Sequence, residues 1–226
     1  MKQLGVLSIA VKRFVCLSGF SSVGKSTVGR MLAERMGLRY VSGGDALKEV
    51  AKMHGFRPTG PGWWETPRGV EFLKLRSKDP SFDKKVDRML LRMCRAGGVV
   101  VDSWVMPWLY KGRSFNVWLT ADRKMRAVRM AERSGISKAK ALRLLAERDL
   151  NSARIYRRLY GIRMGKDLEP FHLVVDTTRL EPKKVVEIIE TVARHYFRVS
   201  TRRRRPSANG SSRKTSTTSR RAWRPS

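Results

Sequence analysis

The stretch GFSSVGKST, residues 19–27, constrains the fold of this 226-residue chain more than any other segment. Its first eight residues match the phosphate-binding pattern G-x-x-x-x-G-K-[S/T] in full. The apolar run FVCLS precedes it and the helical pattern VGRMLAERMG follows it. A glycine-rich turn between a strand and a helix points backbone N–H groups and the positive end of the helix at a phosphate. The sequence therefore predicts a phosphate-binding loop near the start of an α/β domain.

The whole stretch is predicted to hold the phosphates of a nucleotide through Gly19, Phe20, Ser21, Ser22, Val23, Gly24, Lys25, Ser26 and Thr27. Lys25 is expected to reach the β- and γ-phosphates, and the Ser26 hydroxyl to ligate Mg²⁺. Asp102 ends the apolar run GVVVD, where an acid can hold the same ion through water. The alternative for Asp102 is a carboxylate that caps the next turn. ATP and Mg²⁺ are therefore the expected co-substrate and metal.

Further apolar runs follow the loop, and helical patterns separate them. Buried strands are predicted at residues 14–18, 39–42, 98–102, 115–119 and 172–176. Helices are predicted at 25–36, at 83–95, from Ser137 towards Tyr160, and from Pro182 onwards. On the last helix we expect four inward residues, Val185, Ile188, Ile189 and Val192. This alternation is typical of a five-stranded parallel sheet with helices on both faces.

Residues 56–69, FRPTGPGWWETPRG, interrupt the alternation and are predicted to form a loop because they are rich in proline and glycine. They contain adjacent Trp63 and Trp64. An exposed pair of tryptophans would be unusual, so we expect both rings to pack against other side chains. The two cysteines, Cys16 and Cys94, lie in apolar patterns and are expected to be buried reduced thiols.

The formal net charge of the chain is +30. Ten lysine and arginine residues and no acid lie between Arg198 and Ser226, which leaves +20 to the rest of the chain. Composition changes at about Ser200, so residues 1–198 are predicted to form one domain and residues 199–226 a disordered basic tail. The tail is expected to bind RNA or another polyanion weakly. A solvated tail without a partner is the alternative.

No apolar run approaches the roughly 18 residues that a membrane span requires. The N-terminal stretch LGVLSIAV has only eight residues and is followed directly by KR, which fits a signal peptide poorly. We therefore expect a cytoplasmic protein without a membrane partner. The three histidines show no metal-binding spacing, and none is assigned a role.

Arginine is concentrated between residues 123 and 163. Arginines on a mobile element above a phosphate loop neutralise the transferring group, and they exclude water when the element closes. The sequence has no N-K-x-D guanine signature. The pattern therefore favours phosphoryl transfer to a small acceptor over a GTPase switch. A solvated basic helix face is the alternative.

Five segments follow the loop in a fixed order: LRYVSGGDALKEVAKMHG, SKDPSFDKKVDRML, VWLTADRKMRAVRMAER, ERDLNSARIYRRLYGI and HLVVDTTRLEPKKVVEII. In this order, and with the phosphate loop, the chain resembles the archaeal type of cytidylate kinase from about residue 13 to residue 195. The resemblance implies a three-layer P-loop kinase fold with a mobile lid at about 134–165. It also implies transfer of the γ-phosphate of ATP to CMP or dCMP, with Mg²⁺.

By matching positions, the resemblance gives roles in phosphoryl transfer to Lys25, Arg148, Arg154 and Arg157. It places Ser42, Asp45, Asp176 and Arg179 at the acceptor nucleotide. Arg126 would support the lid arginines. A carboxylate and a guanidinium, three residues apart after the last strand, suit the cytosine amino group and a carbonyl or phosphate oxygen. A turn-closing ion pair is the alternative for these two residues.

The chain departs from the family after the third strand, where VDSW stands in place of Glu-Gly-Arg and Trp104 stands where arginine is expected. Arg68, Arg76 or Arg113 are the expected substitutes. Trp63, Trp64 or Trp104 would stack on a base, or would pack in the core. The departures leave two alternatives open: a kinase for AMP, UMP or a non-nucleotide acceptor, and an RNA-associated P-loop ATPase.

Overall fold

The computed structural model describes residues 14–202. The predicted tail therefore lies outside the described residues from position 203 onwards, and so does the N-terminal stretch LGVLSIAV. The last helix, α8 (Pro182–Arg202), continues past the predicted domain boundary at residue 198. Within the described part of the chain, no helix is long and apolar enough to cross a membrane.

Five parallel strands form one sheet, as the sequence predicts. They are β1 Phe14–Ser18, β2 Arg39–Ser42, β3 Val99–Asp102, β4 Phe115–Thr120 and β5 Leu173–Asp176. Their order across the sheet is β2-β3-β1-β4-β5. The register pairs Leu17 with Asp102, so the end of β3 lies beside the end of β1, where the phosphate loop begins.

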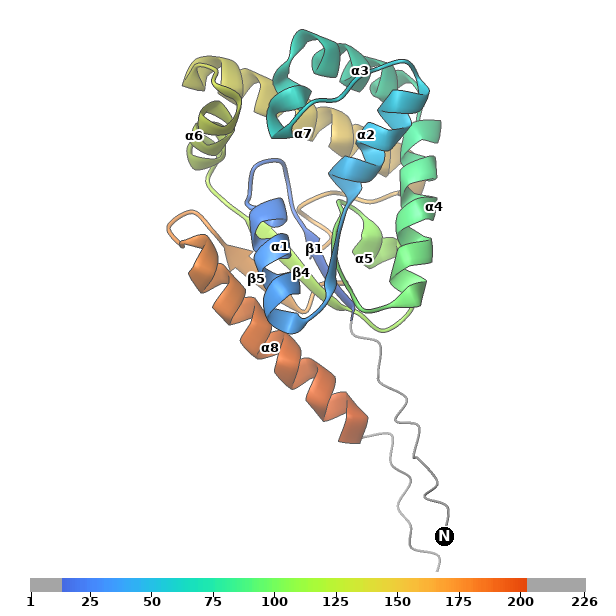
Figure 1. Cartoon of the computed structure of the whole chain (residues 1–226), viewed down its shortest axis with the longest axis vertical. Helices are drawn as coiled ribbons and strands as arrows, with labels where there is room; N and C mark the ends of the chain where they lie inside the picture. The colour runs from blue at the N-terminus through green and yellow to red at the C-terminus, as the bar shows by residue number, and fades with distance from the viewer. Residues whose placement is uncertain (1–13, 203–226) are drawn as a thin grey trace, which may run out of the picture.

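Helices connect the strands and cover both faces of the sheet (Figure 1). They are α1 Lys25–Met36, α2 Gly43–Met53, η1 Pro61–Glu65, α3 Pro67–Lys78, α4 Ser81–Ala96, α5 Met106–Leu109, α6 Arg123–Ser134, α7 Lys138–Tyr160 and α8. Alternate residues of β1 divide the core between the two faces. Val15 and Leu17 pack with α1 and α8, whereas Phe14 and Cys16 pack with α2, α3 and α4.

The two outer strands differ from the prediction of five buried strands. Residues of β2 are exposed or half-buried, and Val174 of β5 is 50% exposed. An edge strand has a neighbour on one side only, so part of its surface meets solvent. Two of the four residues predicted to face inward on α8 are buried, and the other two are not. Ile188 and Val192 are exposed, and Val186 and Ala193 are buried in their place.

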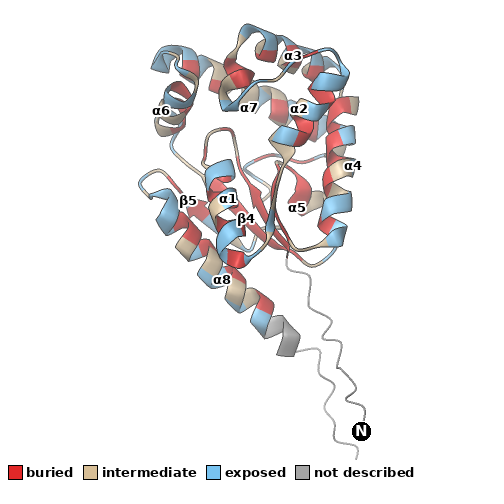
Figure 2. Ribbon diagram, viewed as in Figure 1, coloured by how far each residue is buried: buried red, intermediate tan, exposed pale blue. Residues whose placement is uncertain are grey.

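The predicted loop at residues 56–69 is partly helical. It contains η1 and the start of α3, and both helices carry proline in their first turn, where its missing N–H is not needed. The prediction that Trp63 and Trp64 pack in the core is confirmed, because both rings are buried beside Phe72. Figure 2 shows buried positions on both sides of the sheet and beneath α3. Both cysteines are buried and free, as expected.

A buried polar network ties α3 and α4 to α7. Arg76 pairs with Asp83 at 2.7 Å, and the Tyr156 hydroxyl donates to the same carboxylate at 2.9 Å. Although burial opposes the charge, the Asp83 carboxylate keeps the pKa of Arg76 above its usual value. Arg76 Nη1 also donates to Ser152 Oγ at 3.3 Å. A buried charge that loses its partner is costly. Movement of α7 would take Ser152 and Tyr156 away from this buried pair, so the network favours one position of the helix.

The stability of the wild type is expected to fall as pH rises, because the buried Asp87 carboxyl loses its proton. The Asp87→Asn variant should not show this fall. Burial raises the pKa of Asp87 to about 7, while the Tyr160 hydroxyl, which donates to Oδ2 at 2.7 Å, opposes the rise. The folded state therefore binds this proton more tightly than the unfolded chain does. Wild-type stability should then fall between about pH 4 and about pH 7, the interval between the two pKa values.

Asparagine carries no charge, and its carbonyl oxygen still accepts from Tyr160. Urea unfolding at about pH 5 and about pH 8 measures the effect. The stability of the Asp87→Asn variant relative to wild type should be higher at the upper pH. An equal difference at both pH values would contradict the assignment.

Candidate active site

A cavity of about 860 Å³ lies at the carboxyl ends of the strands. Ligands of open α/β sheets bind at this edge. The phosphate loop and the first turn of α1 form one wall, and the first turns of α2 form another. Arginines of α6 and α7 also line the cavity, as do Trp64 and Trp104. In Figure 1 the phosphate loop between β1 and α1 points toward α7.

The phosphate loop has the backbone that its glycines predict. Gly19 has φ +143°, and a Cβ at this position would collide with the carbonyl oxygen of Leu119. Gly24 has φ +97° and precedes α1, whose first turn has no side-chain cap. The first N–H groups of α1 are therefore available to an anion. All residues from Ser21 to Thr27 line the cavity.

Lys25 is buried within the loop. Its Nζ donates to the carbonyl oxygens of Gly19 at 3.0 Å and Phe20 at 2.9 Å. The ammonium also lies 5.4 Å from the centroid of the Trp104 ring. Burial lowers the pKa of Lys25, and the nearby Asp102 carboxylate opposes this change. The cation is thus held within the loop and lines the cavity.

Ser26 and Asp102, the predicted metal residues, are in contact. Ser26 Oγ donates to Asp102 Oδ2 at 2.8 Å, and the Tyr40 hydroxyl donates to the same oxygen at 3.2 Å. No group of three or more His, Cys, Asp or Glu side chains that could hold a metal occurs among residues 14–202. Mg²⁺ is commonly held by one or two protein oxygens together with substrate phosphates and water. One hydroxyl and one carboxylate beside the phosphate loop fit this requirement.

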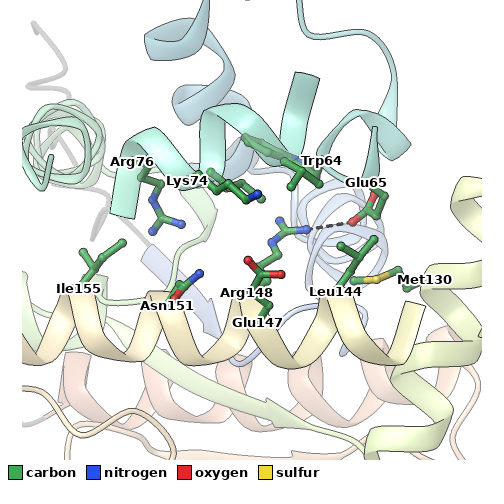
Figure 3. Close-up of a pocket in the computed structure, with 12 residues that line it drawn as sticks. Trp64, Glu65, Lys74, Arg76, Met130, Leu144, Glu147, Arg148, Asn151 and Ile155 are labelled. Atoms are coloured by element: carbon green, nitrogen blue, oxygen red, sulfur yellow. Dashed lines mark hydrogen bonds and ion pairs between the residues drawn. The ribbon is translucent and has the colours of Figure 1, made fainter. Parts of the chain in front are cut away.

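Arg148 of α7 is brought to the cavity, as predicted. Its Nη1 lies 3.1 Å from Glu65 Oε1, and its guanidinium lies 5.3 Å from the centroid of the Trp64 ring. Figure 3 shows Arg148 extending from α7 towards these two side chains, with a dashed line to Glu65. Glu65 also accepts from Arg133 at 2.9 Å and from Ser134 at 3.0 Å. Burial lowers the pKa of Arg148 to about 10, so the guanidinium remains charged at neutral pH.

Arg154 and Arg157 are exposed on α7 and do not line the cavity. At about 100° per residue, Arg157 lies on the opposite side of the helix from Arg148. The inner side of this part of α7 instead presents Ser152 and Tyr156 to the Arg76–Asp83 pair. The structure therefore brings one of the three predicted lid arginines to the phosphate loop.

Two of the four predicted acceptor residues line the cavity. Ser42 caps α2 by accepting from the N–H of Asp45 at 3.1 Å. Asp45 in turn lies 3.5 Å from Lys48 and 3.7 Å from Arg30. Lys48 also lines the cavity and donates to the carbonyl oxygen of Gly60 at 3.2 Å. Sequence reasoning missed Lys48, although it follows Asp45 by one helical turn.

The other two, Asp176 and Arg179, do not line the cavity. The Asp176 carboxylate closes a turn by accepting from the N–H of Thr178 at 2.8 Å and from its hydroxyl at 2.5 Å. These hydrogen bonds lower the pKa of Asp176. Among the described residues no ion pair joins Asp176 to Arg179. The turn is therefore closed by a threonine rather than by the arginine.

None of the three expected substitutes for the family arginine reaches the cavity. Arg68 pairs with Glu71 on the surface of α3, and Arg76 is committed to the buried pair with Asp83. Arg113 donates to carbonyl oxygens of α8. Trp104 itself lines the cavity and lies edge-on to Phe20, with ring centroids 6.1 Å apart.

Asp149 is a residue that sequence reasoning missed. Its carboxylate accepts from the N–H of Ser21 in the phosphate loop at 3.2 Å and pairs with Arg126 at 2.7 Å. Arg126 also donates to the carbonyl oxygen of Ser21 at 3.2 Å. The predicted support residue Arg126 thus connects α6 and α7 to the phosphate loop. The available signal was the position of Asp149, which directly follows Arg148 on the predicted lid helix.

Comparison with known proteins agrees with this geometry. A profile described as the cytidylate kinase-like family matches residues 14–179. The cytidylate kinase of Pyrococcus horikoshii is 30% identical over 184 residues, which cover 81% of this chain and 90% of that protein. The cytidylate kinase of Ignicoccus hospitalis is 37% identical over 180 residues, covering 78% and 96%.

Among solved structures, a shikimate kinase from Bacteroides thetaiotaomicron matches with a TM-score of 0.51 and 13% identity, covering 82% of this chain and 98% of that one. At this identity the match supports the P-loop kinase fold alone. The relatives confirm the prediction of a nucleoside monophosphate kinase. This chain belongs to the cytidylate kinase-like family.

Proposed function

We propose that the protein transfers the γ-phosphate of ATP to CMP or dCMP and releases ADP with CDP or dCDP. The observation that carries this proposal is one cavity that joins an intact phosphate loop to a second wall on α2, with arginines of α6 and α7 beside both. The first wall suits a nucleoside triphosphate, and the second suits a smaller phosphorylated acceptor. The relatives' name, cytidylate kinase, supports cytosine as the base.

The donor would bind with its phosphates on the loop. The N–H groups at the start of α1 and the Lys25 ammonium would hold the β- and γ-phosphates. Ser26 and Asp102 would hold Mg²⁺, which neutralises phosphate charge when bound. Phosphoryl transfer demands little covalent chemistry from the protein, so catalysis rests on alignment and charge stabilisation.

The acceptor would bind between α2 and the phosphate loop. Lys48 would meet its phosphate, and Ser42 and Asp45 line the cavity beside it. Arg148 would neutralise the transferring group from the other side, and Trp64 and Trp104 would exclude water from it. Water exclusion matters because hydrolysis of ATP competes with transfer to the acceptor. Asp176 and Arg179 line no part of this cavity, so recognition of cytosine by that pair requires a different conformation of their turn.

Trp104 favours a second candidate, a kinase for another small acceptor such as AMP or UMP. The ring stands where the family resemblance expects a guanidinium, and none of Arg68, Arg76 and Arg113 replaces it in the cavity. An aromatic ring offers stacking area to any base, whereas a guanidinium selects by hydrogen bonding. The base preference is therefore the part of the proposal that needs direct measurement.

The test is ADP production from Mg-ATP in the presence of CMP, dCMP, UMP, AMP or GMP, each supplied separately. We expect CMP or dCMP to accelerate ADP production at least tenfold, and EDTA to abolish the acceleration because phosphates need the metal. Faster turnover with AMP or UMP would replace the acceptor in the proposal. Stimulation by RNA in place of every monophosphate would establish an RNA-associated ATPase instead.

A further inference from the structure

The outer face of α4 is basic along its whole length. Its five exposed cations are Lys84, Lys85, Arg88, Arg92 and Arg95. At about 100° per residue they fall within an arc of about 100°. The buried side chains Phe82, Val86 and Leu90 occupy the opposite side and pack into the core. In Figure 1 the helix lies at the edge of the molecule, and Figure 2 marks exposed positions along it.

No acid neutralises this face. The two acids of α4, Asp83 and Asp87, point inward and are engaged by Arg76 and by the Tyr160 hydroxyl. Asp79, before the helix, accepts from the N–H of Ser81 at 2.8 Å; hydrogen bonds to Ser81 lower the pKa of Asp79 most, and Lys85 contributes less. Among the described residues, no salt bridge involves any of the five cations. Their charges are therefore available to a partner.

The spacing of the cations suits a repeating anion. Lys84, Arg88 and Arg92 follow one another at intervals of four residues, which is about 6 Å along the helix, and Arg95 extends the row. A rigid row of this kind can meet successive phosphates of one strand without ordering any backbone. The arc contains no apolar side chain that would enter a lipid bilayer, so a membrane surface fits it less well.

We propose that the basic face of α4 docks the sugar–phosphate backbone of RNA. The arc offers cations and no aromatic or amide side chain, so the contact would read phosphates and not base sequence. The face is separate from the active site, because no residue of α4 lines the cavity. Docking would hold the enzyme on RNA while leaving the cavity open.

The choice of RNA over DNA rests on the proposed function. Hydrolysis of the phosphodiester bonds of RNA yields ribonucleoside monophosphates, the class to which CMP, one of the two proposed acceptors, belongs. An enzyme held on RNA would meet its acceptor where such hydrolysis releases it. The docking itself does not depend on this choice, since the same cations would attract any phosphodiester backbone.

The test compares two variants of the full chain with equal changes in charge. One carries Lys84→Gln, Arg88→Gln, Arg92→Gln and Arg95→Gln on α4. The control carries Arg39→Gln, Lys111→Gln, Lys138→Gln and Lys183→Gln, which are exposed, scattered and outside the described salt bridges. Both retain the basic C-terminal segment. Fluorescence anisotropy would measure binding to an RNA duplex, and to a DNA duplex of the same sequence, over a range of salt concentrations.

We expect the α4 variant to bind the RNA duplex at least tenfold more weakly than wild type, with a slope of log K against log salt smaller by about 3. The control should lose less than threefold. Equal losses in the two variants would overturn the proposal, because net charge alone would then explain binding. Tighter binding to DNA than to RNA would overturn the choice of RNA.

Kinase activity separates this proposal from the proposed function. The α4 variant should keep the wild-type rate with the preferred monophosphate, because none of its substitutions lies in the cavity. If no monophosphate is phosphorylated by wild type while the α4 variant still loses RNA binding, the proposed function fails and the docking surface stands. If monophosphates are phosphorylated and RNA binding does not depend on α4, the docking surface fails alone.

Discussion

Replacing Lys25 with alanine is expected to lower kcat by about 10²–10³-fold, the effect of removing one preorganised charge from a transition state. Lys25 is the cation inside the phosphate loop, and it bonds only to carbonyl oxygens of Gly19 and Phe20 and faces the Trp104 ring. Because these partners carry no net charge, its positive charge is not neutralised by a direct ion pair. The charge spread over the oxygens of the γ-phosphoryl group in the transition state would meet that cation.

The variant should still bind ATP, because the N–H groups of the loop and of α1 remain. Isothermal titration calorimetry with ATP, beside initial rates with the preferred acceptor, separates binding from chemistry. Lys52→Ala is the matched control, because Lys52 is an exposed lysine of α2 that pairs with Glu49 and does not line the cavity. A near wild-type kcat for Lys25→Ala would contradict the prediction, because it would show that this lysine does not contribute to phosphoryl transfer.

The sequence predicts those parts of the site that local patterns determine. The phosphate loop is a contiguous motif, and the Ser26–Asp102 contact follows from two strands that end at the same edge of a parallel sheet. The helical periodicity of the sequence also indicates that Arg148 and Arg157 face opposite directions. They are nine residues apart, and at about 100° per residue they lie on opposite sides of α7. The resemblance assigned both arginines to the lid without testing this periodicity.

Other parts of the site depend on contacts between distant segments. Glu65 lies 83 residues before Arg148, in a stretch whose prolines and glycines predict a loop. No local pattern indicates that this stretch folds as η1 and buries a carboxylate against two arginines. The edge positions of β2 and β5 likewise depend on strand order, which apolar runs do not specify. Sequence patterns therefore determine the phosphate loop more directly than the contacts of the lid.

Replacing Arg148 with alanine is the second large expected effect, a fall in kcat of about 10²–10³-fold. Arg148 is the one predicted lid arginine that lines the cavity, and burial against Trp64 and Glu65 restricts its guanidinium to one place. A positioned charge of this kind acts most strongly where water is excluded. Since the charge would matter most in the transition state, KM for ATP should change less than kcat.

Two further variants separate the charge from its support. Arg143→Ala removes an exposed arginine of the same helix that lies outside the cavity, so its kcat should match wild type. Glu65→Gln keeps the shape of the side chain and one hydrogen-bond-accepting oxygen, but it removes the negative charge that pairs with Arg148 and Arg133. Its kcat should therefore fall by less than that of Arg148→Ala, and Arg148→Lys should recover only part of the activity because lysine lacks the planar fork.

Initial rates at saturating ATP and acceptor, with thermal unfolding to confirm that each variant folds, check this ordering. If Arg148→Ala and Arg143→Ala behave alike, the lid of this enzyme works without Arg148, and the exposed Arg154 and Arg157 become the residues to replace. If Glu65→Gln loses as much activity as Arg148→Ala, the buried carboxylate is as necessary as the cation that it holds. In that case the η1 segment belongs to the catalytic apparatus, because it would position the arginine that the transferring phosphate meets.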